Sequence, residues 1–314
     1  MKNNKVIVVG SYNLDMTITT NDFPQPGETV IGKSLTYGHG GKGANQAVAA
    51  ARSGAQVRLL AKVGTDLNGD QAIDTLSREG IITSSIRKAT DTPTGMAAIT
   101  VNDHGENSIV VVSGANSTLS TAEVEHEESI ISDADILLTQ LETPLESVVS
   151  AIKCARKHRV CVILNPAPAQ ALSSDILSDV NIITPNLVEA EMLTNISISD
   201  DLTLKQAANK LHTFGVEIVI ITQGARGVYL SNQGEGKFFP AIEVQAVDTV
   251  GAGDVFNGVL AAHYSGNGSL DQAVSFAVVA AGLSVTKRGA QSRIPDLEDI
   301  HAYLREQAVP VNDF

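Results

Sequence analysis

Cysteine is scarce in this chain of 314 residues, which contains only Cys154 and Cys161. A disulfide framework is therefore excluded. Cys161 lies inside the apolar run VCVIL, so both residues are expected to be buried free thiols in a reducing cytosol. A disulfide between them or a metal pair is the less favoured alternative. We assign neither cysteine a histidine or acidic partner at the spacing of metal ligands, and we expect no metal there.

Basic clusters and long hydrophobic runs are also lacking. The formal net charge is −13 and basic runs such as the pair Lys287 and Arg288 are short, so no interaction with nucleic acid is expected. The apolar stretch in MKNNKVIVVG is too short for a signal-peptide core or a membrane span. We therefore expect a soluble, cytoplasmic protein without membrane contact.

Short apolar runs alternate with helical patterns along most of the chain. The runs are continuous rather than alternating, which favours strands buried on both faces. They cover residues 5–10, 57–64, 134–142, 159–168, 181–186 and 217–224. The helical patterns between them include GANQAVAAARSG, LESVVSAIKCARKH and TLKQAANKLHTFG. This order predicts an α/β fold in which helices cover a mostly parallel sheet.

Two segments interrupt this alternation. Residues 13–40 and 92–112 show a period of two with turn residues and no helical pattern, and VNDHGENSI is typical of two strands around a loop. We expect both segments to form hairpins that join in one small sheet, placed as a lid. The predicted domains are an α/β domain of residues 1–12, 41–91 and 113–314, and a β-lid of residues 13–40 and 92–112.

The stretch DTVGAGDVFNG, residues 248–258, places glycines around a single carboxylate where a helix is predicted to begin. Glycine permits close approach to the backbone, and a helix start offers unpaired N–H groups to an anion. The P-loop is excluded because no Gly-Lys-Ser/Thr follows. Asp254 is interpreted either as a carboxylate that stabilises its own helix or as a base beside an anion hole formed by Gly251, Ala252 and Gly253. Taken alone, the stretch favours the first interpretation.

A second glycine-rich turn, GGKGANQAVAAARSGA at residues 40–55, also leads into a predicted helix. Its small apolar face is explained by close packing of the helix on the sheet. That packing does not explain Lys42 between two glycines. Lys42 and Asn45 are able to hold a sugar hydroxyl or a phosphate oxygen.

These motifs together carry a resemblance to a known family. GSYNLD, PGETV, GGKGANQAVAAARSGA, LNPAPA, ITPNLVEAE and AVDTVGAGDVFNG resemble the ribokinase branch of the ribokinase-like carbohydrate kinase family, from about Lys5 to Pro295. The resemblance implies a doubly wound α/β domain with a β-lid that pairs two subunits as a homodimer. It implies phosphorylation of D-ribose at O5 by MgATP, giving ribose 5-phosphate and ADP. A kinase for deoxyribose or another furanose, and a catalytically silent sugar-binding or regulatory protein, are the alternatives.

The resemblance also implies roles for particular residues. Asp254 is the catalytic base, and Gly251, Ala252 and Gly253 form the anion hole. The sugar site is lined by Asn13, Asp15, Gly41, Lys42, Asn45, Glu142 and Asp254. One carboxylate is able to accept two adjacent hydroxyls, which suits Asp15 to a sugar.

Nucleotide and metal positions follow from the same resemblance. The nucleotide contacts are Asn186, Thr222, Gln223, Gly224, Ala225, Arg226, Gly227 and Gly253, and Glu189 is linked to Mg²⁺ and phosphate placement. An activating K⁺ is held by Asp248, Val250, Ser284, Lys287 and Gly289, largely through carbonyls. The chain departs from the pattern at Arg293, where the family commonly has a serine that binds potassium, and at Val278, which replaces a polar residue near the adenosine.

Three further residues are interpreted without a catalytic role. His39 precedes the Gly-Gly-Lys turn, and we expect it to be a solvated loop histidine, with contact to the substrate as the less favoured alternative. Ala97 and Ile99, in the second lid segment, are expected to pack against the sugar or the lid of a partner subunit, or within the lid itself.

Overall fold

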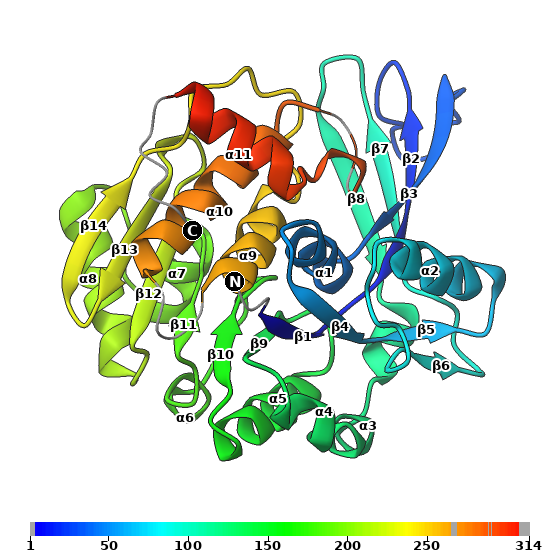
Figure 1. The fold of residues 1–314 in the computed structure, drawn as a ribbon. Helices are drawn as coiled ribbons and strands as arrows, with labels where there is room; N and C mark the ends of the chain where they lie inside the picture. The colour runs from blue at the N-terminus through cyan, green and yellow to red at the C-terminus, as the bar shows by residue number, and fades with distance from the viewer. Residues whose placement is uncertain (1–3, 265–268, 288, 290, 308–314) are drawn as a thin grey trace.

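The computed structural model describes residues 4–264, 269–287, 289 and 291–307. Its largest sheet has eight strands (Figure 1) in the order β14 (Glu235–Phe239), β13 (Val228–Asn232), β12 (Ile218–Thr222), β11 (Ile182–Ile183), β10 (Cys161–Leu164), β9 (Ile136–Thr139), β1 (Lys5–Val9) and β4 (Gln56–Leu60). The strands from β12 to β4 are parallel, whereas β13 and β14 add an antiparallel edge. The prediction of a mostly parallel sheet is confirmed.

Helices cover both faces of this sheet, as the doubly wound fold requires. Successive residues of β1 point to opposite faces, so Val6 and Val8 join one core cluster while Ile7 and Val9 join the other. The first cluster contains residues of α1 (Lys42–Arg52), α2 (Leu67–Arg78), α9 (Ala252–His263), α10 (Leu270–Ser284) and α11 (Leu297–Glu306). The second contains residues of α3 (Thr121–His126), α4 (Glu128–Ser132), α5 (Leu145–Lys157), α6 (Ser174–Leu177), α7 (Leu187–Thr194) and α8 (Asp201–Thr213).

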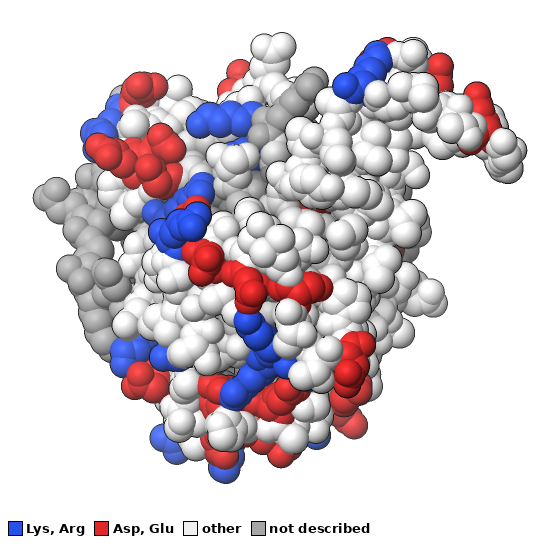
Figure 2. Space-filling view, turned by 90° about the vertical axis from the view of Figure 1, so that its right-hand side faces the viewer, with Lys and Arg blue, Asp and Glu red and all other residues white. Residues whose placement is uncertain are grey.

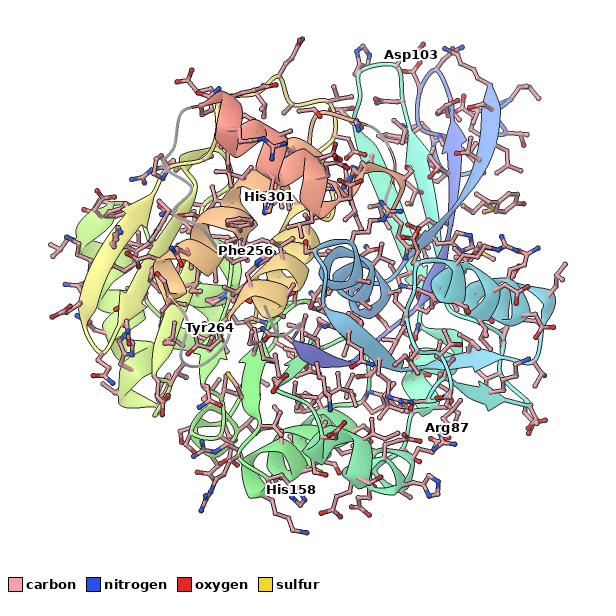
Figure 3. The ribbon with its side chains drawn as sticks, in the orientation of Figure 1. Arg87, Asp103, His158, Phe256, Tyr264 and His301 are labelled. Atoms are coloured by element: carbon pink, nitrogen blue, oxygen red, sulfur yellow. The ribbon has the colours of Figure 1, made fainter. Side chains whose placement is uncertain are left out.

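A separate four-stranded sheet stands beyond α1 (Figure 1), in the order β3 (Ser34–Gly40), β2 (Asn13–Thr19), β7 (Met96–Val101) and β8 (Asn107–Val112). The β2–β3 and β7–β8 pairs are antiparallel hairpins, and β2 pairs with β7 in parallel. The two interrupting segments therefore form one small sheet, as predicted. Asp103 lies at the tip of this sheet (Figure 3) and forms an exposed ion pair with Lys33 of the other hairpin.

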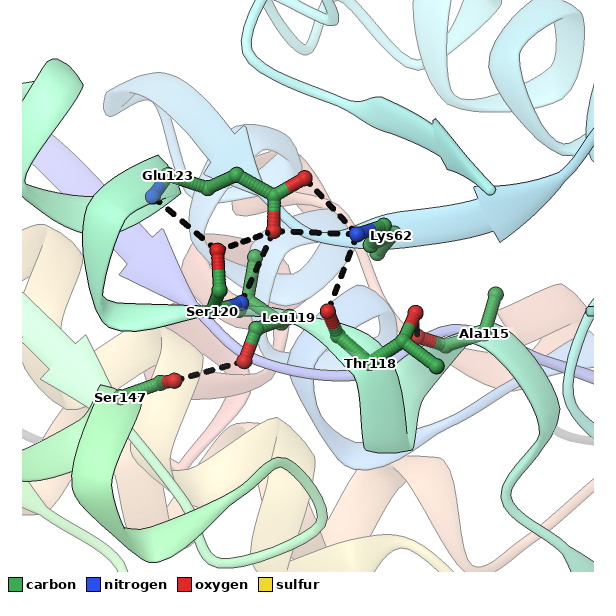
Figure 4. A network of polar contacts seen from close by, with 7 residues as sticks. All are labelled: Lys62, Ala115, Thr118, Leu119, Ser120, Glu123 and Ser147. Carbon is green, nitrogen blue, oxygen red and sulfur yellow. Dashed lines mark hydrogen bonds and ion pairs between the residues drawn. The ribbon is translucent and has the colours of Figure 1, made fainter. Parts of the chain in front are cut away.

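The predicted strand at 57–64 is divided, because the chain leaves the main sheet after β4. Its second half, β5 (Lys62–Gly64), pairs with β6 (Arg87–Ala89). Lys62 then donates to the carbonyl of Thr118 at 2.9 Å and pairs with Glu123 at 2.8 Å (Figure 4). Ser147 of α5 donates to the carbonyl of Leu119 at 2.6 Å. These contacts fix the 3₁₀ turn η1 (Gly114–Thr118), which follows the small sheet.

Close packing of α1 on α9 sets the position of the candidate site. A Cβ at Gly258 of α9 would lie 2.4 Å from the carbonyl oxygen of Gln46 on α1, so only glycine permits this approach. The approach places the first turns of the two helices side by side. Among the described residues no helix is long and apolar enough to cross a membrane. On the face shown in Figure 2, acidic and basic side chains are interspersed, without a continuous basic surface.

Candidate active site

The start of α9 forms one wall of the site. Gly251 caps the helix with a φ of 79°, a left-handed conformation that glycine adopts without steric cost. Gly253, in the first turn, is exposed, whereas Asp254 is only 6% exposed. The unpaired N–H groups and partial positive charge of a helix start attract anions. The tip of α9 therefore joins an accessible anion-binding surface to a buried carboxylate.

The carboxylate of Asp254 is held by the neighbouring helix. Asn45 donates from Nδ2 to Oδ2 at 3.1 Å, and Gln46 donates from Nε2 to Oδ1 at 3.0 Å. Both residues belong to α1, and no bond among the described residues joins this carboxylate to an amide of its own helix. Asp254 is therefore positioned by α1, while its place in the first turn of α9 still allows a favourable interaction with the dipole of that helix.

The surroundings of Asp254 change its acidity. Burial raises the pKa of this carboxyl, against the opposing effects of the Lys42 charge and the hydrogen bonds from Gln46 and Asn45. The negative charge of Glu142 adds to the rise. A buried carboxylate with a raised pKa accepts a proton more readily than an ordinary aspartate, which suits a general base.

Lys42, the first residue of α1, lies among carboxylates. Burial lowers the pKa of its ammonium group, but the charges of Asp254, Glu142 and Glu189 outweigh this effect and the net shift is upward. Lys42 is therefore positively charged. Its backbone N–H donates to Oε2 of Glu142 at 3.0 Å, and Ser11 donates to the same oxygen at 2.5 Å. One cation thus balances several acids in a small volume.

Asp15 on β2 adds a further carboxylate, which comes from the small sheet. Burial raises its pKa to about 7, and the charges of Glu142 and Asp254 contribute to the rise. Its carboxylate lies over Gly40, where a Cβ would come within 2.2 Å of Oδ2. Asp15 therefore faces the acids of the α/β domain, although the three residues come from β2, the loop after β9, and α9.

The glycines around Lys42 have a packing role. A Cβ at Gly41, which has a φ of 87°, would lie 2.7 Å from the backbone nitrogen of Asn13. One at Gly43 would lie 2.4 Å from the nitrogen of Ser11. The expected close packing of helix on sheet thus explains these glycines. The same packing brings Lys42 and Asn13 into the site.

Sequence reasoning missed Asn116, which holds Asn13 and Tyr12 in place. It lies in η1, donates from Nδ2 to Oδ1 of Asn13 at 2.9 Å and accepts from the backbone of Tyr12 at 2.9 Å. Asn116 is 1% exposed. No pattern in the sequence marks a buried asparagine within a short 3₁₀ turn.

A chain of buried amides behind Asp254 was also missed. Gln46 accepts from Gln140 at 2.6 Å and donates to Asn165 at 3.1 Å, and Asn165 donates to the carbonyl of Thr184 at 3.1 Å. Thr184 donates to Asn257 at 2.6 Å. Gln140, Asn165 and Thr184 directly follow β9, β10 and β11, so the signal lay in polar residues at strand ends.

Asn186 and Glu189 form a capping box at the start of α7. Glu189 accepts from the backbone of Asn186 at 2.8 Å, and Asn186 accepts from the backbone of Glu189 at 2.8 Å. Asn186 is bridged to Thr222 at the end of β12. Burial raises the pKa of Glu189, while the Asn186 hydrogen bond and Lys42 oppose the rise. The pair therefore has a structural role and also lies within reach of the charges of the site.

The predicted nucleotide loop is a tight turn after β12. It contains the 3₁₀ turn η2 (Gly224–Arg226) and Gly227, whose φ is 90° and whose Cβ would meet the carbonyl of Phe239. Both side-chain polar atoms of Gln223 are buried and have no hydrogen-bond partner among the described residues. Such atoms mark a position for a polar ligand. Arg226 instead pairs with Asp201 at 2.6 Å on the surface.

The residues assigned to potassium lie around the loop before α9. Oδ1 of Asp248 accepts from the backbone of Val250 at 3.0 Å, and the buried Ser284 donates to the carbonyl of Ala281 at 2.7 Å. Lys287 is exposed, Gly289 has a φ of 107°, and the nonpolar Val278 is buried in α10. Arg293, in the 3₁₀ turn η3 (Gln291–Arg293), is also buried and donates to the backbone carbonyl of Asp248 at 2.8 Å.

The expectation for His39 is wrong. The residue lies on β3, half-buried, with Nδ1 2.6 Å from the hydroxyl of Tyr12 and Nε2 3.3 Å from that of Thr75. Its place in the strand, opposite Leu14, directs the ring inward instead of into solvent. Ala97 and Ile99 lie on β7 as expected, with Ala97 buried.

The expectation that no metal-ligand neighbours surround the cysteines is also wrong for Cys154. Cys154 and His158 lie one turn apart near the end of α5, and ligand atoms of both lie within 4.8 Å of a carboxylate oxygen of Glu128. That carboxylate already accepts from Lys157 at 2.7 Å. Both cysteines are free, as predicted, but half-buried. Figure 3 places His158 at the lower edge of the molecule, away from Phe256 of α9.

Comparison with known proteins agrees with this geometry. The chain matches the model of the pfkB family of carbohydrate kinases over residues 3–297. It is similar to a ribokinase of Haemophilus influenzae (46% identity over 297 residues, 95% of this chain and 97% of that protein) and a deoxyribokinase of Salmonella typhi (37% over 300 residues, 95% and 98%). A solved ribokinase of Arabidopsis thaliana, complexed with ribose and ATP, has a TM-score of 0.89 at 30% identity, covering 97% of this chain and 99% of that one. The chain belongs to the pfkB family of carbohydrate kinases.

Proposed function

We propose that the protein transfers the γ-phosphoryl group of ATP to O5 of D-ribose, giving ribose 5-phosphate and ADP. The observation that carries the proposal is the buried Asp254, which Asn45 and Gln46 hold beside the glycine-capped start of α9. The ribokinase of Haemophilus influenzae, at 46% identity, supports this choice of sugar.

The geometry suits a direct in-line transfer. The O5–P bond forms as the bond between the γ-phosphorus and its bridging oxygen breaks, and the proton of the O5 hydroxyl passes to Asp254. The amides of Gly251, Ala252 and Gly253 stabilise the charge on the transferred group. The raised pKa of Asp254 favours its part as the proton acceptor.

The sugar would be oriented by polar atoms from both sheets. Oδ1 of Asn45 is buried and has no hydrogen-bond partner among the described residues, so a sugar hydroxyl is a fitting donor to it. Asp15 and Glu142 supply carboxylate acceptors, with Asn13 and the backbone at Gly41 beside them. We propose that the small sheet acts as a lid over this sugar and excludes water, which competes with O5 for the phosphoryl group.

The nucleotide is proposed to bind along the turn from Thr222 to Gly227, beside Asn186. The unpaired amide of Gln223 fits a polar group of the nucleotide. Mg²⁺ suits the carboxylate of Glu189 and the ATP phosphates, and when bound it neutralises phosphate charge. We do not extend the proposal to potassium, because Arg293 already occupies the Asp248 carbonyl.

We also propose a cytoplasmic homodimer, in which the small sheets of two subunits pair. The two free cysteines agree with a reducing compartment. Strand β8 lies at the edge of its sheet and exposes Ile109, Val110, Val111 and Val112. An exposed apolar edge strand is a surface that pairs with another chain. Sedimentation tests this pairing, since a Val110→Lys variant should shift toward monomer.

A comparison of substrates tests the proposed reaction. We expect kcat/KM for D-ribose to exceed that for 2-deoxyribose by at least about tenfold, because a site that hydrogen-bonds a hydroxyl disfavours the analogue lacking it. ADP release measured on purified protein with both sugars decides the point. A higher kcat/KM for 2-deoxyribose would instead identify this protein as a deoxyribokinase, as the Salmonella typhi relative is named. Ribose binding in calorimetry without ADP release would indicate a silent sugar-binding protein.

The acidity of Asp15 predicts a pH dependence. Its pKa of about 7 belongs to the free enzyme, and only its ionised form accepts hydrogen bonds from two sugar hydroxyls. We therefore expect kcat/KM for ribose to rise by up to about tenfold per unit below pH 7 and to level off above it. An Asp15→Asn variant should have a lower kcat/KM without this step. MgATP titrates alike in both proteins, and Asp254, whose pKa is also raised, contributes to both profiles. The difference between the two profiles therefore reports on Asp15.

Stability supplies the second measurement for Asp15. Its pKa is raised above the ordinary value of 3.8, so the folded protein binds this proton more tightly than the unfolded chain. The resulting stabilisation is complete below about pH 4 and is lost as the pH rises to about 7. Asp15→Asn should therefore have a higher Tm than the wild type at pH 8 without sugar. Equal Tm values and equal pH profiles would contradict the assignment.

A further inference from the structure

Arg293 is a buried cation outside the set of residues with assigned roles. Its side chain is 1% exposed, and Nη1 lies 2.8 Å from the backbone oxygen and 3.1 Å from Oδ2 of Asp248. Burying a charge is costly unless it is paired and hydrogen-bonded. Because the guanidinium binds the carbonyl and the carboxylate of one residue, it fixes the backbone of Asp248 as well as its side chain.

The guanidinium lies beside Gly251, the first residue of the proposed anion hole. The point where a Cβ of Gly251 would stand is 3.3 Å from Nη2 of Arg293 and 3.6 Å from Oδ2 of Asp254. Asp248 also accepts from the backbone of Val250 at 3.0 Å. The segment from Asp248 to Gly251 is therefore folded around the guanidinium, and its conformation determines where the first amides of α9 point.

The turn that carries Arg293 is itself anchored. Arg52, at the end of α1, donates to the carbonyls of Gln291 at 2.9 Å and Ile294 at 2.7 Å, on either side of Arg293. Glu79 holds Arg52 through two further bonds. The backbone of the turn that presents Arg293 is therefore fixed. Because the arginine side chain is also buried, it has little rotamer freedom left to lose.

A potassium ion does not fit this arrangement. The resemblance assigns the ion to carbonyls of Asp248 and Val250, but the Asp248 carbonyl accepts from Arg293. A second cation on that oxygen would stand beside the guanidinium and be repelled by it.

We propose that Arg293 is a built-in monovalent cation, a positioning residue that holds the Asp248–Gly251 segment in place of potassium. The protein then needs no potassium for activity. This inference rests on the proposed function for its kinetic part, while the binding of potassium to the folded protein tests it independently.

The first experiment needs no variant. Kinase activity of the wild type is measured in chloride salts of potassium, sodium and tetramethylammonium at equal ionic strength. We expect kcat/KM in the three salts to agree within about twofold. Activation by potassium of fivefold or more over sodium would overturn the proposal. If the protein phosphorylates no ribose in any salt, the proposed function is wrong. Thermal unfolding then tests separately whether Arg293 takes the place of potassium.

Variants at Arg293 provide the second experiment. Arg293→Ser should lose about 10- to 100-fold in kcat in sodium, with the KM for ribose little changed. This loss is smaller than the roughly 100- to 1,000-fold loss on removal of an anion-hole donor, because the amides are displaced and not removed. Potassium should restore much of this loss, because the vacated space accepts an ion. Arg293→Lys, which keeps a charge, should retain more activity in sodium than Arg293→Ser. Arg305→Ser removes an exposed arginine of α11 and is the matched control, with no response to potassium.

Thermal unfolding gives a readout that does not depend on turnover. Exchanging sodium for potassium should leave the Tm of the wild type and of Arg305→Ser unchanged and raise that of Arg293→Ser. A wild-type Tm that rises selectively with potassium would contradict the proposal. An Arg293→Ser protein that is folded but equally impaired in every salt would show that Arg293 does not stand in for an ion. If that variant does not fold, the wild-type measurements decide the question.

Discussion

Replacing Asp254 with asparagine is expected to lower kcat for ribose phosphorylation by at least about 100-fold while changing the KM for ribose much less. Asparagine keeps the volume of the side chain but cannot accept the proton of O5. Its amide oxygen would accept from Gln46, and its amide nitrogen would face the donor of Asn45, whose side-chain amide is able to turn and present Oδ1 as an acceptor. Steady-state kinetics with ribose and calorimetric ribose binding measure the two effects separately.

A matched variant separates catalysis from helix stabilisation. Asp271 lies in the first turn of the neighbouring helix α10, where it is exposed and paired with Lys237. Asp271→Asn should leave kcat unchanged and lower stability by no more than about 1 kcal/mol, the usual value of a first-turn carboxylate. If Asp254→Asn turned over ribose at a near-normal rate, the proton would have to go elsewhere and the proposed mechanism would fail.

The main sheet was predictable because its strands are buried on both faces. In runs such as VIVV in β1 the side chains on both faces of the strand are apolar. A continuous apolar run therefore identifies such a strand without knowledge of the strands that pair with it. The hairpin of β13 and β14 was missed, although Gln233 and Gly234 have positive φ values that suit a two-residue turn. EGKFF is mostly exposed and shows little apolar pattern, so only its turn carried a signal.

The candidate site was predictable where a motif joins backbone geometry to chemistry. Lys42 among its glycines and Asp254 after Gly251 and Gly253 are such cases. In each, the glycines and the charged residue stand within a few positions of one another in the sequence. Gln46 and Asn116 carry no local mark, because their importance comes from partners about 100 to 200 residues away in the chain. The same limit applies to Arg293. The sequence showed a departure from the family pattern there, and only the contact with Asp248 shows its physical meaning.

Two glycines of α9 should respond in opposite ways to alanine. A Cβ at Gly258 would meet the Gln46 carbonyl at 2.4 Å and the Cβ of Ala49 at 2.6 Å, so Gly258→Ala forces α1 and α9 apart. We expect it to lower stability by about 1–3 kcal/mol, as overpacking does. A Cβ at Gly253 meets nothing within 4 Å, so Gly253→Ala should keep or slightly raise the Tm, by reducing the freedom of the unfolded chain.

The expected effect of Gly253→Ala on turnover is large for the same reason that its effect on folding is small. A helical Cβ tilts toward the N-terminus of its helix, which here is where the transferred phosphoryl group would approach the exposed amide of Gly253. The methyl group would therefore occupy space reserved for the phosphate, and kcat should fall by at least about 100-fold, as when an anion-hole donor is lost. Thermal unfolding and steady-state kinetics on the same preparation measure both quantities. A stable Gly253→Ala protein with near-normal kcat would show that the phosphoryl group is not bound at the tip of α9, because the methyl group and the phosphoryl group would need the same space.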